Sequence, residues 1–195
     1  MTRYTLYLLV FAAATFWMAV AQDGTVLKPV SISGETQTFE IPSWGHDAPA
    51  LLMDVPVGFA LTRRQGPDFD VYFLEQPGDP AHRRMGIYVG HTPNPMASKS
   101  ATVEPGMVGP RKIGWHVWSE EDQGKTLYFR EAIVPAFFKG LAKGTPDSRK
   151  PAATDSGPQG PLYGNLSIHV WAQGTDADQV KTMAGWAKSI RKSGR

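Results

Sequence analysis

Apolar and polar residues alternate in short runs along most of the chain, and Gly or Pro separates the runs. In the run Phe-Asp-Val-Tyr-Phe, for example, Phe69, Val71 and Phe73 share one face of an extended segment, and the residues between them face the other way. Period-two alternation predicts β-strands with one buried and one wetter face, as in an antiparallel sheet. We predict strands at Thr38–Ile41, Leu51–Val55, Phe59–Thr62, Phe69–Leu74, Met85–Val89, Ile113–Trp118, Thr126–Val134 and Leu166–Trp171.

The last element has the spacing of an amphipathic helix. Its apolar residues recur at intervals of three and four, which places them on one helix face: Val180, Met183, Ala184, Ala187 and Ile190. Acidic residues at its start and basic residues at its end match the helix dipole, with Thr175 as the expected N-cap: Asp176 and Asp178, then Lys188, Arg191 and Lys192. We expect this helix to pack on the sheet. Residues 136–142 predict a short helix or an irregular turn.

These elements predict an α+β fold in which an antiparallel β-sheet packs against a C-terminal amphipathic helix, with an α/β/α sandwich as a further option. Residues 22–37 are rich in Gly, Ser, Thr and Pro and predict a flexible lead-in with at most one edge strand. Residues 38–195 predict one globular domain. Residues 143–161 contain no large apolar side chain, so we expect a mobile surface loop inserted in that domain.

The N-terminal segment has the pattern of a secretory signal peptide. Arg3 supplies one positive charge, the stretch from Tyr4 to Ala21 carries none, and the stretch ends on Ala-Val-Ala before polar turn formers. We predict cleavage after Ala21 and export to a periplasm or the cell exterior. The alternative is an uncleaved membrane anchor, because the uncharged stretch is close to the roughly 17–25 residues that span a bilayer.

The amino-acid composition excludes several classes of site and partner. The chain has no cysteine, which excludes disulfides, thiolate metal ligands, cysteine nucleophiles and lipid attachment at a cysteine. Lys and Arg number 20 against 18 Asp and Glu, so the protein is nearly neutral and lacks the basic excess of a nucleic-acid-binding protein. We expect no nucleic-acid partner and, once the signal is removed, no stable membrane span.

Two segments resemble the PsbP-like α/β sandwich family. The first is Leu-Leu-Met-Asp-Val-Pro-Val-Gly-Phe at Leu51–Phe59, and the second is the end of the last helix, Ala187–Ile190, which follows a late strand. In order of elements the resemblance extends from Leu51 to Ile190. It implies an antiparallel sheet flanked by helices and a non-catalytic scaffold that binds a partner, and it assigns no site residue.

Histidines are the candidate metal ligands, and their spacing gives no metal signature. The chain has five histidines and none forms an H-x-H, H-x-x-x-H or H-E-x-x-H pair: His46, His82, His91, His116 and His169. Ligands from separate strands still converge in some sites. We predict no metal and no cofactor. The sequence also lacks a G-x-S-x-G elbow and a phosphate-binding Gly-rich loop.

His116 and His169 alternate with tryptophan inside predicted strands. His116 shares a face with Trp118, and His169 shares a face with Trp171. If this face is open, the two His-Trp pairs form a surface that stacks a sugar ring or an aromatic ligand. If a helix covers it, both histidines are ordinary core residues. Similarly, adjacent Arg130 and Glu131 must face opposite ways, so that one of them points inward and needs a partner.

The segment after the strand at Met85–Val89 is a second candidate site. It reads Gly-His-Thr-Pro-Asn-Pro-Met, and its two prolines stiffen a polar loop that contains His91 and Asn94. Stiff polar loops at strand ends often contain binding groups. The same residues also form plain turns for backbone reasons alone.

Two functional hypotheses follow. The first is an exported, non-catalytic scaffold that binds a protein partner or a small ligand on the Trp118/Trp171 face or beside His91. The second is a small hydrolase or metal-assisted enzyme in which His91, His116 or His169 converge from different strands. Geometry separates them, because the enzyme needs at least two of these histidines at ligand distance beside a carboxylate.

Overall fold

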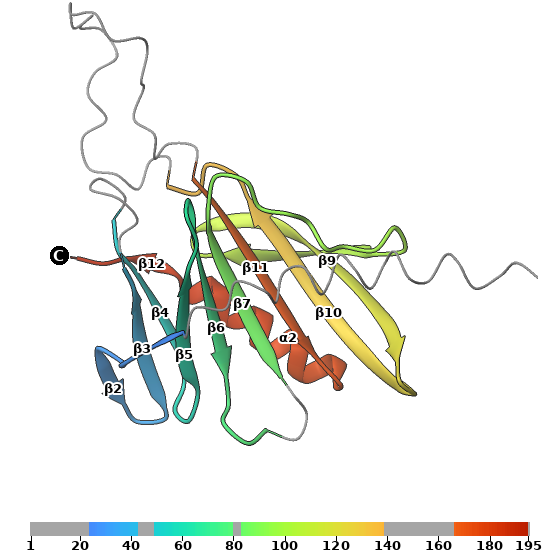
Figure 1. The fold of residues 1–195 in the computed structure, drawn as a ribbon, viewed down its shortest axis with the longest axis horizontal. Helices are drawn as coiled ribbons and strands as arrows, with labels where there is room; N and C mark the ends of the chain where they lie inside the picture. The colour runs from blue at the N-terminus through green and yellow to red at the C-terminus, as the bar shows by residue number, and fades with distance from the viewer. Residues whose placement is uncertain (1–23, 43–48, 80–82, 139–165, 195) are drawn as a thin grey trace, which may run out of the picture.

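A computed structural model of the protein describes residues 24–42, 49–79, 83–138 and 166–194. Its strands form two antiparallel sheets, of eight strands in the order β1-β5-β6-β7-β11-β10-β9-β8 and of four in the order β12-β4-β3-β2 (Figure 1). The elements are β1 Thr25–Leu27, β2 Ser31–Ser33, β3 Thr36–Ile41, β4 Leu51–Pro56, β5 Ala60–Gln65, β6 Phe69–Glu75, β7 Arg84–Gly90, β8 Thr102–Val108, β9 Arg111–Asp122, β10 Lys125–Val134, β11 Ser167–Gly174, helix α2 Ala177–Gly185, the 3-10 helix η2 Trp186–Ser189 and β12 Arg191–Lys192.

The predicted strands agree with the observed ones, and the expected α+β class is confirmed. The prediction was incomplete at the sheet edges, where it allowed one edge strand in residues 22–37. The expected lead-in contains β1 and β2, which lie at edges of the two sheets, and the Pro-containing segment after β7 contains β8. Pro105 fits in β8 because an edge strand leaves one side of its backbone unpaired, so that a missing N–H costs no ladder hydrogen bond.

The C-terminal helix is shorter than predicted. Asp176, and not Thr175, is the N-cap, and its side chain accepts a hydrogen bond of 3.0 Å from Gln179 N. The α-helix ends at Gly185 and continues as η2, so the basic residues expected in its last turn lie in η2 and β12. Residues 135–138 form a turn. The predicted signal peptide, the loop at 143–161 and the rest of the 136–142 segment lie outside the described residues.

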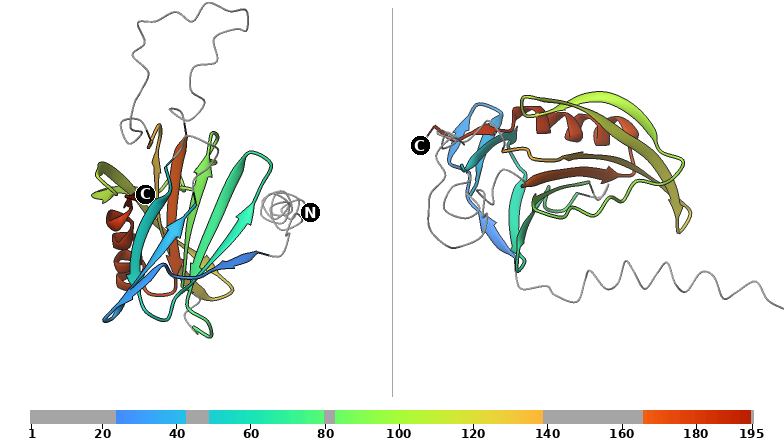
Figure 2. Two further views of the ribbon diagram at one scale, coloured as in Figure 1. Left: turned by 90° about the vertical axis from the view of Figure 1, so that its left-hand side faces the viewer. Right: turned by 90° about the horizontal axis from the view of Figure 1, so that it is seen from above.

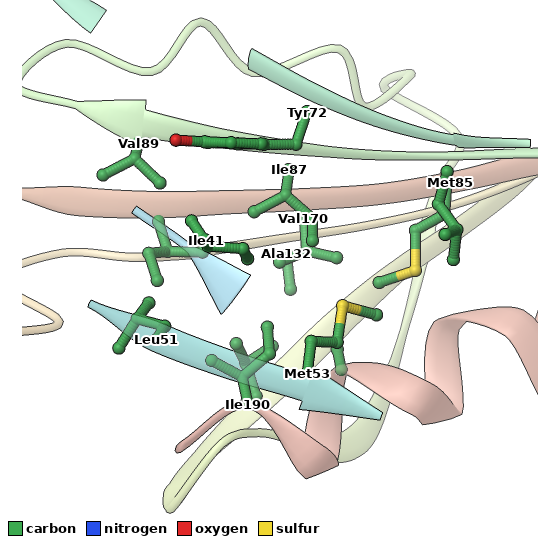
Figure 3. Close-up of a cluster of buried hydrophobic side chains, with 14 of the residues drawn as sticks. Ile41, Leu51, Met53, Tyr72, Met85, Ile87, Val89, Ala132, Val170 and Ile190 are labelled. Atoms are coloured by element: carbon green, nitrogen blue, oxygen red, sulfur yellow. The ribbon is translucent and has the colours of Figure 1, made fainter. Parts of the chain in front are cut away.

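The hydrophobic core lies between the large sheet on one side and α2 with the small sheet on the other. Apolar side chains of β6, β7, β10 and β11 point at β3, β4 and the helix. Figure 3 shows Ile87 of β7 and Val170 of β11 on one side of the core, facing Met53 of β4 and Ile190 on the other. The predicted apolar face of the helix is buried there, with Val180, Met183 and Ala184 facing β10 and β11. Each large apolar side chain buried in this way contributes about 1.5–3 kcal/mol.

The large sheet curls around the helix, so that β8 lies beside η2 (Figure 2). The turn after β8 fixes this contact, because Gly109 N donates a 2.8 Å hydrogen bond to Ala187 O. Gly109 has a φ of +53°, and a Cβ there would lie 2.6 Å from Ile190 O. Glycine is therefore required at this close approach.

The segments Leu51–Phe59 and Ala187–Ile190 lie together in the structure. Asp54 N donates to Ser189 Oγ at 3.0 Å, and the rings of Phe59 and Trp186 meet edge to face at 4.9 Å. Arg191 adds two hydrogen bonds to the Asp54 carboxylate, of 2.6 and 3.0 Å. These contacts attach the end of η2 and β12 to the small sheet.

The Asp54–Arg191 ion pair predicts a pH-dependent stability. The Arg191 guanidinium holds the pKa of Asp54 below its usual value, with help from the Thr38 hydroxyl. A lowered carboxyl pKa stabilises the fold above the unfolded-state pKa, and the contribution disappears as the pH falls through the folded-state pKa. We expect Asp54→Asn to lower the free energy of unfolding at pH 7 and to have little effect at pH 2–3. Urea unfolding at both pH values measures the difference. An equal loss at both pH values would contradict a role for the charge.

Candidate functional site

The two faces of the large sheet differ in what covers them. One face packs on α2, and we call the other the distal face. Since β11, β10 and β9 separate β7 from β8, the connection at residues 91–101 must cross three strands. It crosses on the distal face, where Met96 N donates a 2.8 Å hydrogen bond to Glu131 Oε2, and Figure 2 shows this connection on the side of the sheet away from α2.

Strand pairing brings a row of side chains together on the distal face. Phe73 lies opposite Gly86, Gly86 opposite Trp171, Trp171 opposite Glu131, and Glu131 opposite His116. Residues two positions along each strand extend the same face on either side of this row. On one side they are Glu75, Arg84, Gln173, Phe129 and Trp118, and on the other they include Arg64, Tyr88 and His169.

Trp171 lies flat across the backbone of Gly86. A Cβ at Gly86 would lie 2.0–2.4 Å from three atoms of the indole ring, so only glycine leaves room for the ring. Phe73 meets the indole edge to face at a centroid distance of 6.1 Å, and His169 lies at 5.0 Å. Trp171 as a whole residue is half-buried.

Phe73 has an arginine on each neighbouring strand. The guanidinium carbons of Arg64 and Arg84 lie 5.1 and 5.0 Å from its ring centroid, within the range of cation–π attraction. Arg84 also forms an ion pair through Nε with Glu75. The two arginines place positive charge beside an aromatic surface.

A hollow of about 670 Å³ opens at the Gln173 end of this face. Its lining combines distal-face residues of β5, β6, β7 and β11 with the turn between β6 and β7: Ala60, Thr62, Glu75, Gln76, Pro77, Gly78, Asp79, Arg83, Arg84 and Gln173. Arg83 holds the turn, with Nε donating to Asp79 Oδ2 at 2.6 Å and a terminal nitrogen donating to Gln76 Oε1 at 2.9 Å. The hollow is within the size range of small-molecule sites, about 300–1,000 Å³.

The residues predicted as sites are distributed unevenly. His169 and Trp171 lie together, as described above, but His116 is exposed while Trp118 is buried against the parallel ring of Phe129 at 5.0 Å. Alternation placed His169 beside Trp171 on β11, and their rings do meet. On β9, Trp118 packs on Phe129 of β10 and not on His116.

The loop after β7 holds the other two predicted residues. His91 is half-buried at the end of β7, and Asn94 is exposed in the crossing connection. Thr92 N donates to the Tyr88 hydroxyl at 3.2 Å, and burial raises the pKa of that hydroxyl. The loop thus covers part of the distal face.

His169 and Glu131 form a buried pair beneath the crossing connection. Their side chains are 5% and 2% exposed, and His169 Nε2 lies 3.7 Å from Glu131 Oε1, too far for a hydrogen bond. His169 Nε2 has no hydrogen-bond partner among the described residues. Arg130 and Glu131 face opposite ways as predicted: Arg130 points to the helix side and pairs with Glu104 at 2.6 Å, and Glu131 is buried as well, on the distal face.

Removing the Glu131 carboxylate should loosen the crossing connection. Glu131→Ala leaves Met96 N without its acceptor, and we expect a loss of about 1–3 kcal/mol in the free energy of unfolding. Amide hydrogen exchange should become faster in residues 91–101. Glu131→Gln keeps an acceptor oxygen and should have a smaller effect, and Glu35→Ala, at an exposed position, should have none. Unchanged exchange at Met96 in Glu131→Ala would contradict this role.

Sequence reasoning missed the charged half of the site. Alternation within β6 put Phe73 on the face expected to be buried, which is wrong, because Asp70, Tyr72 and Leu74 face the core and Phe73 lies on the distal face. Arg64, Arg84 and Gln173 come from three other strands. Only the register between strands places them beside one another. Alternation within each strand could have shown which of these residues share a face of their own strand. It could not have shown which strands lie side by side.

Across the described ranges, no three His, Asp or Glu side chains are arranged to hold a metal ion. Nor does any helix in the described part reach the length and apolarity needed to cross a membrane. Comparison of the chain with protein-family models, curated proteins and solved structures finds no match. Function must therefore be argued from the site itself.

Proposed function

We propose that this protein is an exported, non-catalytic binding protein whose small ligand lies on the distal face of the large sheet. The observation that carries the proposal is the union of a half-buried tryptophan, an arginine-flanked phenylalanine and a polar hollow on one face. Sites for small molecules combine apolar walls with a few polar groups that fix orientation. The hollow favours a small ligand over a protein partner, because its volume is that of a small-molecule site.

Two sequence features support the other parts of the proposal. The signal-peptide pattern that ends at Ala21 supports export. The resemblance to the PsbP-like family supports a non-catalytic scaffold and predicts an α/β/α sandwich, with helices on both faces of the sheet. Within the described residues, α2 lies on one face and the crossing connection on the other.

Nuclear magnetic resonance with a library of small molecules and short peptides tests the binding face. We expect small-molecule hits to shift the signals of Phe73, Trp171 and Gln173. A second hollow lies elsewhere on the protein and is lined by Lys188, Arg191 and their neighbours; its signals serve as the internal control. Hits that gather at the second hollow, or peptides that bind the distal face better than any small molecule, would contradict the proposal.

Export is tested separately. The full chain is expressed in a bacterium, the periplasmic and cytoplasmic fractions are separated, and the N-terminus is read by mass spectrometry. We expect a periplasmic protein that begins at Gln22. Retention of Met1–Ala21 on a membrane-bound product would instead show an anchor.

The enzyme hypothesis has a direct measurement. Elemental analysis of the purified protein reports any bound transition metal, and a stoichiometric metal would contradict the non-catalytic proposal.

A further inference from the structure

We propose that the distal face binds a neutral saccharide, with a sugar ring stacked on Trp171 beside the hollow and its hydroxyls hydrogen-bonded to Gln173 and Arg84, which line the hollow. This inference rests on the proposed function and specifies its ligand class. Three independent features of the site support it: the balance of charge in the wall, the polar groups without partners, and the spacing between Gln173 and Trp171.

Charge in the wall of the hollow is balanced. Among the described lining residues, two carboxylates and two guanidiniums are paired with one another: Glu75 with Arg84, and Asp79 with Arg83. An anionic ligand would have to compete with these carboxylates for the arginines, and a cationic ligand would meet the arginines themselves. Because like charges in close contact are unfavourable, the wall favours a neutral ligand.

Polar groups that remain available point to a ligand with many hydroxyls. Among the described residues, no side-chain hydrogen bond involves the Gln173 amide, which lines the hollow and is half-buried. Arg84 contacts Glu75 through Nε, so its terminal nitrogens remain as donors. The amide offers both donors and an acceptor, and hydroxyl groups can satisfy both kinds. An apolar ligand would leave these groups without water or a partner, at a cost in free energy.

Trp171 supplies the apolar half of the site. Its ring lies flat on Gly86 with Phe73 beside it, and Trp171 as a whole residue is half-buried. Sugar rings pack their C–H faces on aromatic faces of this kind, because the face of a sugar ring is apolar while the hydroxyls at its edge are polar. Trp171 and Gln173 are two positions apart on one face of β11, about 7 Å at the usual strand rise. A single sugar unit can therefore contact both side chains.

The experiment measures binding of three neutral trisaccharides, maltotriose, cellotriose and chitotriose, by nuclear magnetic resonance. An anionic trisaccharide, trigalacturonate, and an aromatic acid, indole-3-acetate, serve as comparison probes. We expect at least one neutral trisaccharide to shift both the Trp171 indole N–H and the Gln173 amide signals. Gln173→Leu and Trp171→Ala should each weaken that binding about tenfold or more, which corresponds to about 1.4 kcal/mol. Lys188→Ala, at the second hollow, should leave it unchanged within about a factor of two.

Each of the other outcomes contradicts either the ligand class or the binding face. If trigalacturonate or indole-3-acetate shifts these signals and no neutral trisaccharide does, the ligand class is wrong while the proposed binding face stands. If a neutral trisaccharide binds equally well to Gln173→Leu and Trp171→Ala, both the saccharide inference and the binding face are wrong. If no probe shifts either signal, the saccharide inference fails, and the library screen decides the proposed function on its own. Circular dichroism checks that each variant is folded, and Gln173→Leu keeps the test valid should Trp171→Ala unfold.

Discussion

Arg63→Ala should destabilise the protein by about 3 kcal/mol, because it leaves the buried carboxylate of Asp70 without its charged partner. Asp70 is 1% exposed, and its Oδ2 accepts a 2.9 Å hydrogen bond from Arg63 and a 3.3 Å bond from the Tyr72 hydroxyl. Burial raises the pKa of Tyr72, so this hydroxyl stays protonated and cannot replace the lost charge. We place the effect at the lower end of the range of about 3–5 kcal/mol because water reaches the Arg63 side chain, which is 27% exposed.

Urea unfolding of a small variant set measures this effect. Adding Asp70→Asn to Arg63→Ala removes the uncompensated charge and should recover part of the lost stability. Arg64→Ala is the matched control, because this arginine is the next residue on the same strand, is exposed and contacts only the Phe73 ring in the contacts described above. It should cost at most about 1 kcal/mol. Equal losses for Arg63→Ala and Arg64→Ala would show that the buried pair does not stabilise the fold.

Gly86→Ala should destabilise the protein by about 1–3 kcal/mol and displace Trp171, which makes it the second large effect. The added Cβ would lie 2.0 Å from Trp171 Cζ2, so the indole must leave its position on the sheet. It would then lose its contacts with Phe73 and His169. Tryptophan fluorescence and urea unfolding follow the two consequences. Saccharide binding should be lost together with the flat position of the ring.

A second background makes this prediction sharper. In Trp171→Ala the clash is absent, and Gly86→Ala should then be neutral or stabilising by up to about 1 kcal/mol, because glycine weakens a strand relative to alanine. The effect of one substitution would thus change sign with the other. If Gly86→Ala lowered the free energy of unfolding equally with and without Trp171, the added Cβ would clash with a group other than the indole. Gly185→Ala is the control, since a Cβ there meets no atom within 4 Å.

The different success of prediction on β9 and β11 has a simple physical cause. Alternation fixes which residues of one strand share a face, and it placed His169 beside Trp171 correctly. It does not say which strand lies next to it. Trp118 therefore stacks on Phe129, a residue of β10 that only the hairpin register brings beside it.

Alternation within a strand also could not predict which residues of the distal face are buried. Sequence alternatives for the His-Trp face were an open surface or a covered one, and the protein has both. The β7–β8 connection contacts Glu131 through Met96 N, and His169 beside it is buried, while Trp171 is half-buried. The path of that connection depends on the position of β8 at the far edge of the sheet, which no local pattern specifies.

The sequence by itself determined the local properties of this protein: where most strands lie, which residues of one strand share a face, and that the last helix packs its apolar face on a sheet. These follow from periodicities of two and 3.6 residues, which act within single elements. The tertiary structure decided what happens between elements, namely the strand order, the crossing over Glu131 and the meeting of Arg84, Trp171 and Gln173. These depend on the joint packing of residues distant in the chain, and the proposed binding site is made entirely of such contacts.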